Sequence, residues 1–303
     1  MINKLEDIIH QIRGHKKVIL SVAAAHDEEV LLAIKDAVEN DIINPILIGD
    51  ENIIRKISKE IDFNLNGIKI IQENTIEECA ETAIRIVSSK EADFVMKGML
   101  DTSVILKAVL NKEWGLRTDS LLSHVMVYEI PTYEKLLVIT DGGMNIAPDY
   151  EQKMKILKNA IEATRPFELG TIKVACLAAK EKVNSKMQAT IDARTLQEAG
   201  QRGEFGKDVI VEGPLAFDLA VSKEAARIKG FESDVAGETD IMLMPTIEVG
   251  NGIGKTLTYF AAGKSAGIIM GAKAPIVLVS RADSHESKLY SIAYGALIAS
   301  HCK

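Results

Sequence analysis

Short apolar, β-branched runs alternate with longer segments of helical periodicity along most of this chain. The runs at 16–25, 44–50, 67–72 and 92–99 each precede a segment in which apolar positions recur at helical spacing. Short apolar runs are typical of parallel strands buried on both faces, and strict alternation of strands with helices predicts right-handed βαβ units. The first part of the chain is therefore predicted to be α/β, with a mostly parallel sheet.

The alternation changes once, near the middle. Two predicted strands, Ser123–Glu129 and Lys135–Thr140, are separated by only a few residues. That connection is too short for a parallel crossover and predicts an antiparallel hairpin. The alternation then resumes, with Asp240–Val249 predicted as a strand that carries Pro245. We therefore expect a second α/β domain and a domain boundary near the hairpin.

The last apolar run, Pro275–Val279, leads through Ser280, Arg281 and Asp283 into a helix predicted to end near Ser300. In open α/β sheets, ligands bind beyond the carboxyl ends of strands, often at the N-terminus of the following helix. A hydroxyl and a guanidinium at this point predict an anion site. The alternative is that Ser284 only caps the helix and Arg281 is a surface charge.

A second anion-binding candidate is the glycine-rich segment V-G-N-G-I-G-K-T at 249–256. Val249 stands where the P-loop pattern needs its first glycine, and Lys255 stands where the dinucleotide pattern needs its third. We predict a loop in which the amides of Gly250, Gly252 and Gly254 converge on phosphate or carboxylate, with Lys255 at a helix start. The alternative is that these glycines only permit close packing.

Two further strand ends carry polar groups. Lys97 and Gly98 close the run at 92–99, and Asp141 and Asn145 follow the hairpin. A lysine within a strand is costly unless it reaches a ligand, a carboxylate or solvent. Either pair could bind a ligand, but a lysine reaching solvent and ordinary Asp-Gly-Gly turn chemistry explain them equally well.

Composition excludes several classes of protein. The net charge is −7 and there is no run of five basic residues, which argues against nucleic-acid binding. The three cysteines form no CxxC pair and the six histidines show no ligand spacing, so neither a disulfide framework nor a metal site is expected. The N-terminal segment lacks a signal-peptide core, and no apolar stretch is long enough to span a bilayer. We expect a cytoplasmic protein without membrane partners.

Taken in order, several motifs resemble those of the phosphate acyltransferase family, which includes phosphate acetyltransferases and phosphate butyryltransferases. They are KGML (97–100), ITDGGMN (139–145), EGPLAFDLAV (212–221), VGNGIGK (249–255) and VLVSRADS (277–284). The SRADS and KGM forms and the short length are more similar to phosphate butyryltransferase. The resemblance implies reversible transfer of a short-chain acyl group between CoA and inorganic phosphate, giving acyl phosphate. It implies acyl-CoA and phosphate as substrates, with no metal and no cofactor.

The resemblance also implies a fold and an assembly. The family has two three-layer α/β domains with the site in the cleft between them, similar to isocitrate and isopropylmalate dehydrogenases, and it usually forms homodimers. Because the final helix would return to the first domain, we expect a discontinuous first domain, 1–136 plus 268–303, and a second domain, 137–267.

Site roles follow from the same resemblance. Arg281 would bind the phosphoryl group through two parallel hydrogen bonds, and Ser280 would donate to the thioester carbonyl oxygen as it gains charge. Substrate-binding positions would be Asn251, Gly252, Lys255, Lys97, Gly98, Arg117 and Asn145.

One position departs from the family pattern. Where acetyltransferases carry an aspartate that is proposed as the base for the CoA thiol, this chain has Ser287. Asp283, His285 and Glu286 are the possible replacements. Asp283 is favoured because it lies at the mouth of the helix, and His285 has the ordinary pKa best suited to neutral-pH proton transfer.

Other functions remain open at this stage. A phosphate acetyltransferase would differ only in acyl preference, to which Met144, Met242 and Met244 could contribute by lining a pocket. A non-catalytic acyl-CoA-binding module would keep the cleft without the chemistry. A metal- and NAD-dependent decarboxylating dehydrogenase would need a cluster of aspartates, and no D-x-x-x-D cluster is evident.

Replacing Arg281 tests the assignment of the phosphate site. Arg281→Ala should strongly raise the phosphate concentration needed for half-maximal rate, because the two hydrogen bonds of the guanidinium are lost, while the folded structure persists. Steady-state kinetics against phosphate and circular dichroism would check this. An unchanged phosphate response would remove Arg281 from the site.

Overall fold

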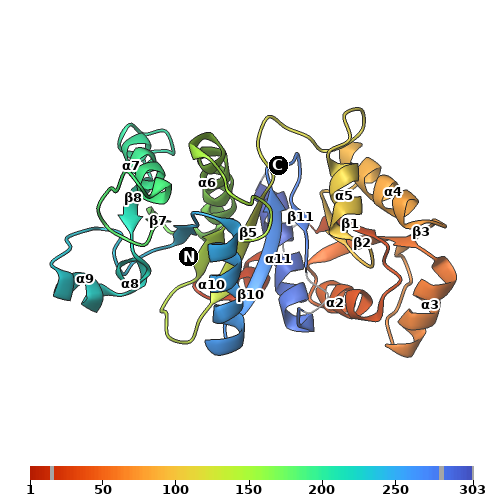
Figure 1. The fold of residues 1–303 in the computed structure, drawn as a ribbon. Coiled ribbons are helices and arrows are strands. Elements are labelled where there is room, and N and C mark those ends of the chain that lie inside the picture. The colour runs from red at the N-terminus through yellow and green to blue at the C-terminus, as the bar shows by residue number, and fades with distance from the viewer. Residues whose placement is uncertain (14–16, 280–282, 302–303) are drawn as a thin grey trace. The chain divides into compact units, whose positions relative to one another are not determined.

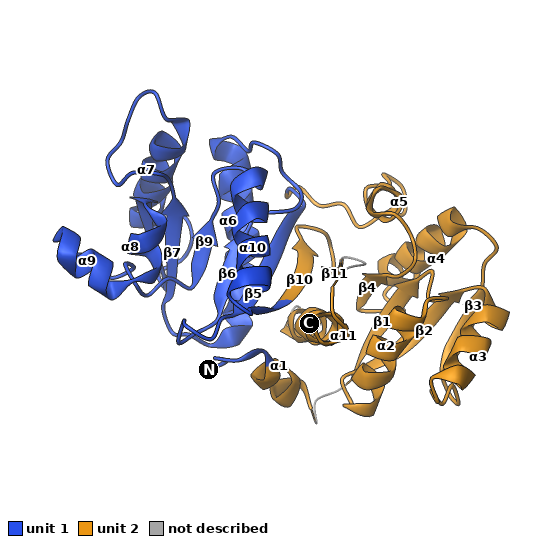
Figure 2. Cartoon of the chain, turned by 60° about the horizontal axis from the view of Figure 1, so that its bottom comes forward, with its two compact units in different colours: residues 1–5, 121–265 blue, residues 6–120, 266–303 orange. Residues whose placement is uncertain are grey.

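The computed structural model describes residues 1–13, 17–279 and 283–301. Within it the chain forms two compact units (Figure 2). Unit 1 contains residues 1–5 and 121–265, and unit 2 contains residues 6–120 and 266–303. The predicted domain boundary at residues 136 and 137 differs from the boundary between these units. It separates the two strands of the hairpin, whereas unit 1 contains both of them. Both units are α/β, with mixed and mostly parallel sheets.

Unit 2 has a sheet in the order β3-β2-β1-β4-β11-β10. Neighbouring strands from β3 to β11 are parallel, and β10 is antiparallel to β11. The predicted alternation of strands and helices is confirmed here. The strands are β1 (Val18–Ala23), β2 (Ile43–Gly49), β3 (Lys69–Gln72), β4 (Phe94–Lys97), β10 (Lys264–Met270, of which 266–270 belong to this unit) and β11 (Ile276–Val277).

Helices cover both faces of this sheet (Figure 1). Helix α11 packs along α2, α2 contacts α3, and α4 packs against α5 and β1. Asp27 and Thr75 cap α2 and α4 by accepting main-chain N–H bonds, as their positions before acidic first turns suggest. The helices are α1 (Leu5–Ile12), α2 (Glu28–Glu39), α3 (Glu51–Glu60), α4 (Ile76–Ser88), α5 (Thr102–Val109) and α11 (His285–His301).

Unit 1 has a sheet in the order β5-β6-β9-β7-β8. The predicted hairpin is confirmed: β5 and β6 are antiparallel, with Met126 opposite Ile139, and the remaining pairs are parallel. The strands are β5 (Ser123–Glu129), β6 (Leu137–Thr140), β7 (Ile172–Leu177), β8 (Val209–Leu215) and β9 (Ile241–Leu243).

The helices of unit 1 also lie on two faces. Helices α6 and α7 pack on β5, β6, β8 and β9, whereas α8 contacts β7 and α10 contacts β6. The elements are α6 (Tyr150–Thr164), the 3₁₀ turn η1 (Arg165–Phe167), α7 (Gln188–Gln201), α8 (Phe217–Val221), α9 (Lys223–Lys229) and α10 (Ile247–Phe260). Of the helices in the described ranges, none combines the length and the apolar composition that a membrane crossing requires.

One predicted boundary is wrong. The strand expected over 240–249 ends at Leu243, and α10 starts at Ile247 after Pro245 and Thr246. The ladder of β9 ends before Pro245, which has no main-chain N–H to donate, and the apolar residues beyond it join a helix. The glycine-rich segment therefore lies inside α10.

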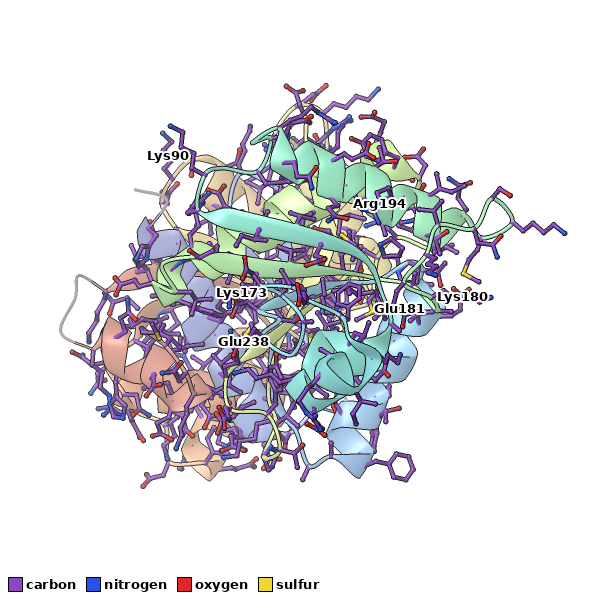
Figure 3. All side chains as sticks on the ribbon, turned by 90° about the vertical axis from the view of Figure 1, so that its left-hand side faces the viewer. Lys90, Lys173, Lys180, Glu181, Arg194 and Glu238 are labelled. Atoms are coloured by element: carbon purple, nitrogen blue, oxygen red, sulfur yellow. The ribbon has the colours of Figure 1, made fainter. Side chains whose placement is uncertain are left out.

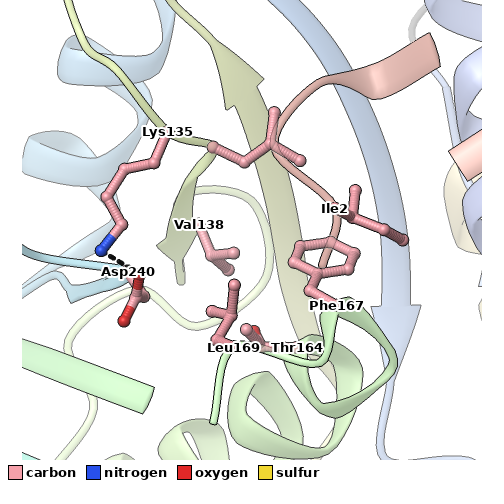
Figure 4. A pocket seen from close by; sticks show the side chains of 8 residues that line it. Ile2, Lys135, Val138, Thr164, Phe167, Leu169 and Asp240 are labelled. Carbon is pink, nitrogen blue, oxygen red and sulfur yellow. Dashed lines mark ion pairs between the residues drawn. The ribbon is translucent and has the colours of Figure 1, made fainter. Parts of the chain in front are cut away.

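A cluster of charges holds the amino-terminal ends of the unit 1 strands. Glu238 is 3.9 Å from Lys173, and both are labelled in Figure 3. Glu238 is also 3.7 Å from Lys135 and pairs with Lys223. Lys135 pairs with buried Asp240 at 2.5 Å beside a small, mainly apolar pocket (Figure 4). Burial raises the pKa of Asp240, whereas the hydrogen bond from Lys223 lowers the pKa of Glu238. Because ligands of α/β sheets bind at the opposite, carboxyl edge, we assign this cluster a structural role.

Substitution of Glu238 should give a pH-dependent loss of stability. The pKa of Glu238 is lower in the folded state than in the unfolded state, where it is about 4.3. The stability that Glu238 contributes is therefore present above the unfolded-state pKa and is lost as pH falls through the folded-state pKa. Glu238→Gln should lower the free energy of unfolding by up to about 1 kcal/mol at pH 7, because the cluster is partly solvated.

Urea unfolding between pH 3 and pH 7 would measure this difference. Glu162→Gln is the matched control, since Glu162 is exposed on α6 and makes no ion pair with the described residues. A Glu238→Gln deficit that stayed constant down to pH 3 would contradict the assignment.

Candidate functional site

A pocket of about 160 Å³ opens at the carboxyl edge of the unit 2 sheet. Asp27 follows β1, Lys97 ends β4 and Val279 follows β11, and these three strands are parallel neighbours. The carboxyl ends of parallel strands lie at the same edge, so topology brings these distant segments together. The described lining residues are Asp27, Glu29, Val30, Lys97, Gly98, Met99, Val279 and Lys288.

Lys97 is buried at the end of β4, with 6 % of its surface exposed. Its Nζ atom donates to the main-chain oxygens of Gly98 (3.2 Å) and Leu100 (3.0 Å), so it does not extend into solvent. A Cβ atom on Gly98 would lie 2.3 Å from the oxygen of Ala24, so only glycine permits the approach of these two strand ends. Both predicted residues therefore line the pocket, and a ligand-binding role for them stays a prediction.

The predicted Ser280 and Arg281 lie outside the described residues, between Val279 in the pocket wall and Asp283. The nearest described residues downstream form the start of α11. Ser284 accepts the N–H of Ser287 at 3.1 Å, so Ser284 caps this helix. The hydroxyl of Ser287, at the family's aspartate position, lies 3.1 Å from the Ser284 hydroxyl.

Lys288 also lines the pocket, although it was not predicted from the sequence. It is 3 % exposed, and its Nζ atom donates to the Asp283 oxygen at 2.9 Å and lies 3.3 Å from Oε2 of Glu29. Asp27 and Glu29, at the start of α2, also line the pocket. One signal was available: Lys288 directly precedes the long, mainly apolar run L-Y-S-I-A-Y-G-A-L-I-A of a helix that is predicted to be buried.

The three candidate bases differ in their surroundings. Nε2 of His285 lies 3.1 Å from Oδ2 of Asp36 on α2, and Glu286 accepts from the hydroxyl of Tyr290 at 3.2 Å. None of the three, Asp283 included, is among the described residues that line the pocket. The assignment of Asp283 stays a prediction.

In unit 1, the predicted Asp141 and Asn145 form one hydrogen-bonded turn. The buried Asp141 carboxylate accepts the N–H groups of Gly143 (2.8 Å), Met144 (2.9 Å) and His124 (3.2 Å) and the amide of Asn145 (2.6 Å). Asn145 also donates to Leu122 at 2.9 Å. Turn chemistry thus accounts for Asp141, and ligand binding by Asn145 stays a prediction.

The expected amide nest at the glycine-rich segment is wrong. Because the segment is helical, its N–H groups point along the helix, and that of Gly250 donates to Thr246. Gly250 and Gly254 serve close packing instead: added Cβ atoms would lie 2.6 Å from the Asp141 oxygen and 2.6 Å from the Tyr128 hydroxyl. The packing alternative is therefore correct for both glycines.

The remaining predicted binding residues of this segment lie on its exposed side. Asn251, Gly252 and Lys255 are exposed, and Asn251 donates to the oxygen of Gly142 at 3.3 Å. Arg117 is also exposed, in the segment between α5 and β5, and is not among the described residues lining the pocket. Substrate binding by these residues stays a prediction.

The two described cysteines are not poised as nucleophiles. Burial raises the pKa of Cys79 to about 11 and that of Cys176 to about 12, so both thiols stay protonated at neutral pH. Within the described ranges, no three His, Cys, Asp or Glu side chains are grouped so as to hold a metal ion.

Comparison with known proteins identifies the family. The family model described as Phosphate acetyl/butaryl transferase matches residues 4–86 and 74–296, which is most of the chain. The chain belongs to this family. The family predicted from the ordered motifs is therefore confirmed.

Individual members of the phosphate acetyl/butaryl transferase family match over nearly their whole length. A phosphate butyryltransferase of Clostridium acetobutylicum is 43% identical over 299 residues, 99% of both chains. A phosphate acetyltransferase of Thermotoga maritima is 41% identical over 295 residues, 97% of this chain and 99% of its own. The solved structure of a branched-chain phosphotransacylase from Enterococcus faecalis V583 has a TM-score of 0.82 at 32% identity, covering 93% of this chain and 99% of its own.

Two glycines of α10 provide a matched test of the packing role. Gly252→Ala should raise the free energy of unfolding by about 0.5–1 kcal/mol, because alanine favours a helix and its Cβ meets nothing within 4 Å. Gly250→Ala should lower it by about 1–3 kcal/mol, because its Cβ would press on the Asp141 main chain. Urea unfolding would compare them. Equal effects would show that α10 does not pack closely on the Asp141 turn.

Proposed function

We propose that this protein is a phosphate acyltransferase that moves a short-chain acyl group reversibly between CoA and inorganic phosphate, with butyryl or a branched group as the acyl substrate. The observation that carries this proposal is the match to phosphate butyryl- and acetyltransferases along the whole chain, including the SRADS segment. A non-catalytic acyl-CoA-binding module would not need to retain Ser280 and Arg281, and both are present.

The reaction needs no covalent enzyme intermediate. A phosphate oxygen attacks the thioester carbonyl carbon, the carbon–sulfur bond breaks, and CoA leaves as a thiolate that takes up a proton. In the reverse reaction, the CoA thiolate attacks the carbonyl carbon of acyl phosphate and phosphate leaves. Arg281 holds the phosphate and Ser280 donates to the carbonyl oxygen, where negative charge develops. Catalysis then comes from positioning and charge stabilisation.

The pocket of unit 2 supports this assignment. Two buried ammonium groups, of Lys97 and Lys288, line it from different elements, and Val279 in its wall directly precedes Ser280. The pocket lies at the carboxyl edge of a parallel sheet, where ligands of α/β proteins bind, and the chain continues from its wall into Ser280 and Arg281.

The acyl group is the finer part of the proposal. The butyryl- and acetyltransferase relatives are 43% and 41% identical, too close to discriminate between acyl groups. Met242 and Met244 belong to the core of unit 1 at 0 % and 1 % exposed, so we assign them to packing rather than to an acyl pocket. The butyryl proposal therefore depends on the SRADS and KGM motif forms.

Further expectations accompany the function. We infer that the enzyme acts in the cytoplasm as a homodimer, in short-chain fatty acid metabolism, without a metal or an organic cofactor. We also infer that its two units have the fold of isocitrate and isopropylmalate dehydrogenases. The mixed, mostly parallel sheets and the discontinuous chain path support that fold.

Phosphate-dependent release of CoA thiol from acetyl-, propionyl-, butyryl- and isobutyryl-CoA, without added metal, tests the proposal. We expect kcat/KM to peak at a four-carbon substrate. Discrimination should be about 10–200-fold at most per methylene, because one methylene contributes little binding energy. A peak at acetyl-CoA would establish the acetyltransferase alternative, and tight CoA binding without any release would favour the binding module.

A further inference from the structure

The start of α11 buries a lysine where a helix disfavours one. Lys288 is among the first four residues of α11, near the positive end of the helix dipole, yet it is only 3 % exposed. Burying an ammonium group costs free energy unless the group is paired and hydrogen-bonded. Such departures from local preference occur mainly at functional or strained sites. The position of this lysine therefore needs an explanation.

The contacts of Lys288 connect two separate segments. Its side chain runs back toward the helix N-terminus, where Nζ donates to the main-chain oxygen of Asp283 at 2.9 Å. The same atom lies 3.3 Å from the carboxylate of Glu29, in the first turn of α2. Asp283 comes two residues after Arg281 in the chain. The lysine thus ties the first described residue after Arg281 to a different helix.

A second buried lysine, in unit 1, offers a comparison pair, because the cavity that it lines has a volume of only about 10 Å³ and is too small for a substrate. Lys153 on α6 lies 2.6 Å from Asp192 on α7, with side chains only 6% and 5% exposed. That pair joins two helices through side chains alone. Lys288 instead holds a main-chain carbonyl between β11 and α11, and it lines the pocket together with Lys97.

We propose that Lys288 is a positioning residue of the acyl-transfer site, acting through the carbonyl of Asp283 and the carboxylate of Glu29. The proposal rests on the proposed function, in which Arg281 and Ser280 contact the substrates. Losing the ammonium group frees the Asp283 carbonyl from α2, and in the chain this carbonyl is only two residues from Arg281. Small displacements of this kind have large effects on rate.

The test compares Lys288→Met with Lys153→Met. Both remove a buried ammonium group and both should lower the melting temperature. At a temperature where each variant is fully folded, Lys288→Met should lower kcat/KM for phosphate about 10–100-fold and raise the KM for phosphate. Lys153→Met should leave both constants at wild-type values, because a structural lysine affects only the amount of folded enzyme.

Two more variants keep the test decisive if Lys288→Met does not fold. Lys288→Arg retains the charge and should recover part of the lost kcat/KM. Glu29→Gln should also lower kcat/KM, but by a smaller factor than Lys288→Met, because the contact between Lys288 and the Asp283 oxygen remains. Because Glu29 and Lys288 act as one unit, the fold-decrease in kcat/KM of the double variant Glu29→Gln, Lys288→Arg should be smaller than the product of the fold-decreases of the two single variants.

The outcomes separate the two hypotheses. If the wild-type enzyme is active but the Lys288 variants have the same kcat and the same KM for phosphate as Lys153→Met, the positioning role is overturned and the proposed function stands. Independent, multiplicative effects of the Glu29 and Lys288 substitutions would also overturn the positioning role. A wild-type enzyme that releases no CoA from any acyl-CoA would overturn the proposed function and this role with it.

Discussion

Unit 2 depends on a helix that is buried on almost every side. Residues 290 to 299 of α11 are all buried, so this helix has no solvent-facing stripe and needs a complete groove. Within unit 2, α2, β1, β4 and β11 form much of that groove. Most of it comes from the first part of the chain, whereas α11 and β11 come from the last. The return of the chain to unit 2 follows from this burial requirement.

The same packing places the pocket. A Cβ atom on Gly295 would lie 2.8 Å from Val277 and 3.0 Å from Phe94, so α11 rests directly on β4 and β11. The N-terminal end of α11 is thereby fixed beside the carboxyl ends of those strands. Lys288 is carried into the interior at this point, and Glu29 and Asp283 are the groups within its reach. Burial of a whole helix therefore determines which charges line the pocket.

Sequence patterns predicted the parts that depend on local periodicity. Short apolar runs marked the parallel strands, and the short connection near Pro131 marked the hairpin. The start of α10 was missed because an apolar run such as that at 240–249 has no period that separates a strand from a helix. The amide nest failed for the same reason: glycines that suit a phosphate loop also suit a helix packed closely against another backbone.

Contacts between distant segments could not be predicted in this way. Lys288 and Glu29 are 259 residues apart, and only the sheet order brings α2 and α11 together. Lys97 was noticed because it ends a strand, but its inward direction depends on the neighbouring carbonyls of Gly98 and Leu100. Motif resemblance supplied the function, whereas the tertiary structure supplied the partners of each group.

The charges around the pocket bear on how phosphate is held. The ammonium groups of Lys97 and Lys288 are matched by the carboxylates of Asp27 and Glu29, so the described lining is close to neutral. A phosphate dianion that enters a near-neutral, partly buried pocket needs a further cation to compensate its loss of hydration. Arg281 follows Val279 of the pocket wall by two residues. The proposed function assigns this role to Arg281, because an always-charged guanidinium offers parallel donors to two phosphate oxygens, whereas Lys97 and Lys288 are engaged with main-chain oxygens.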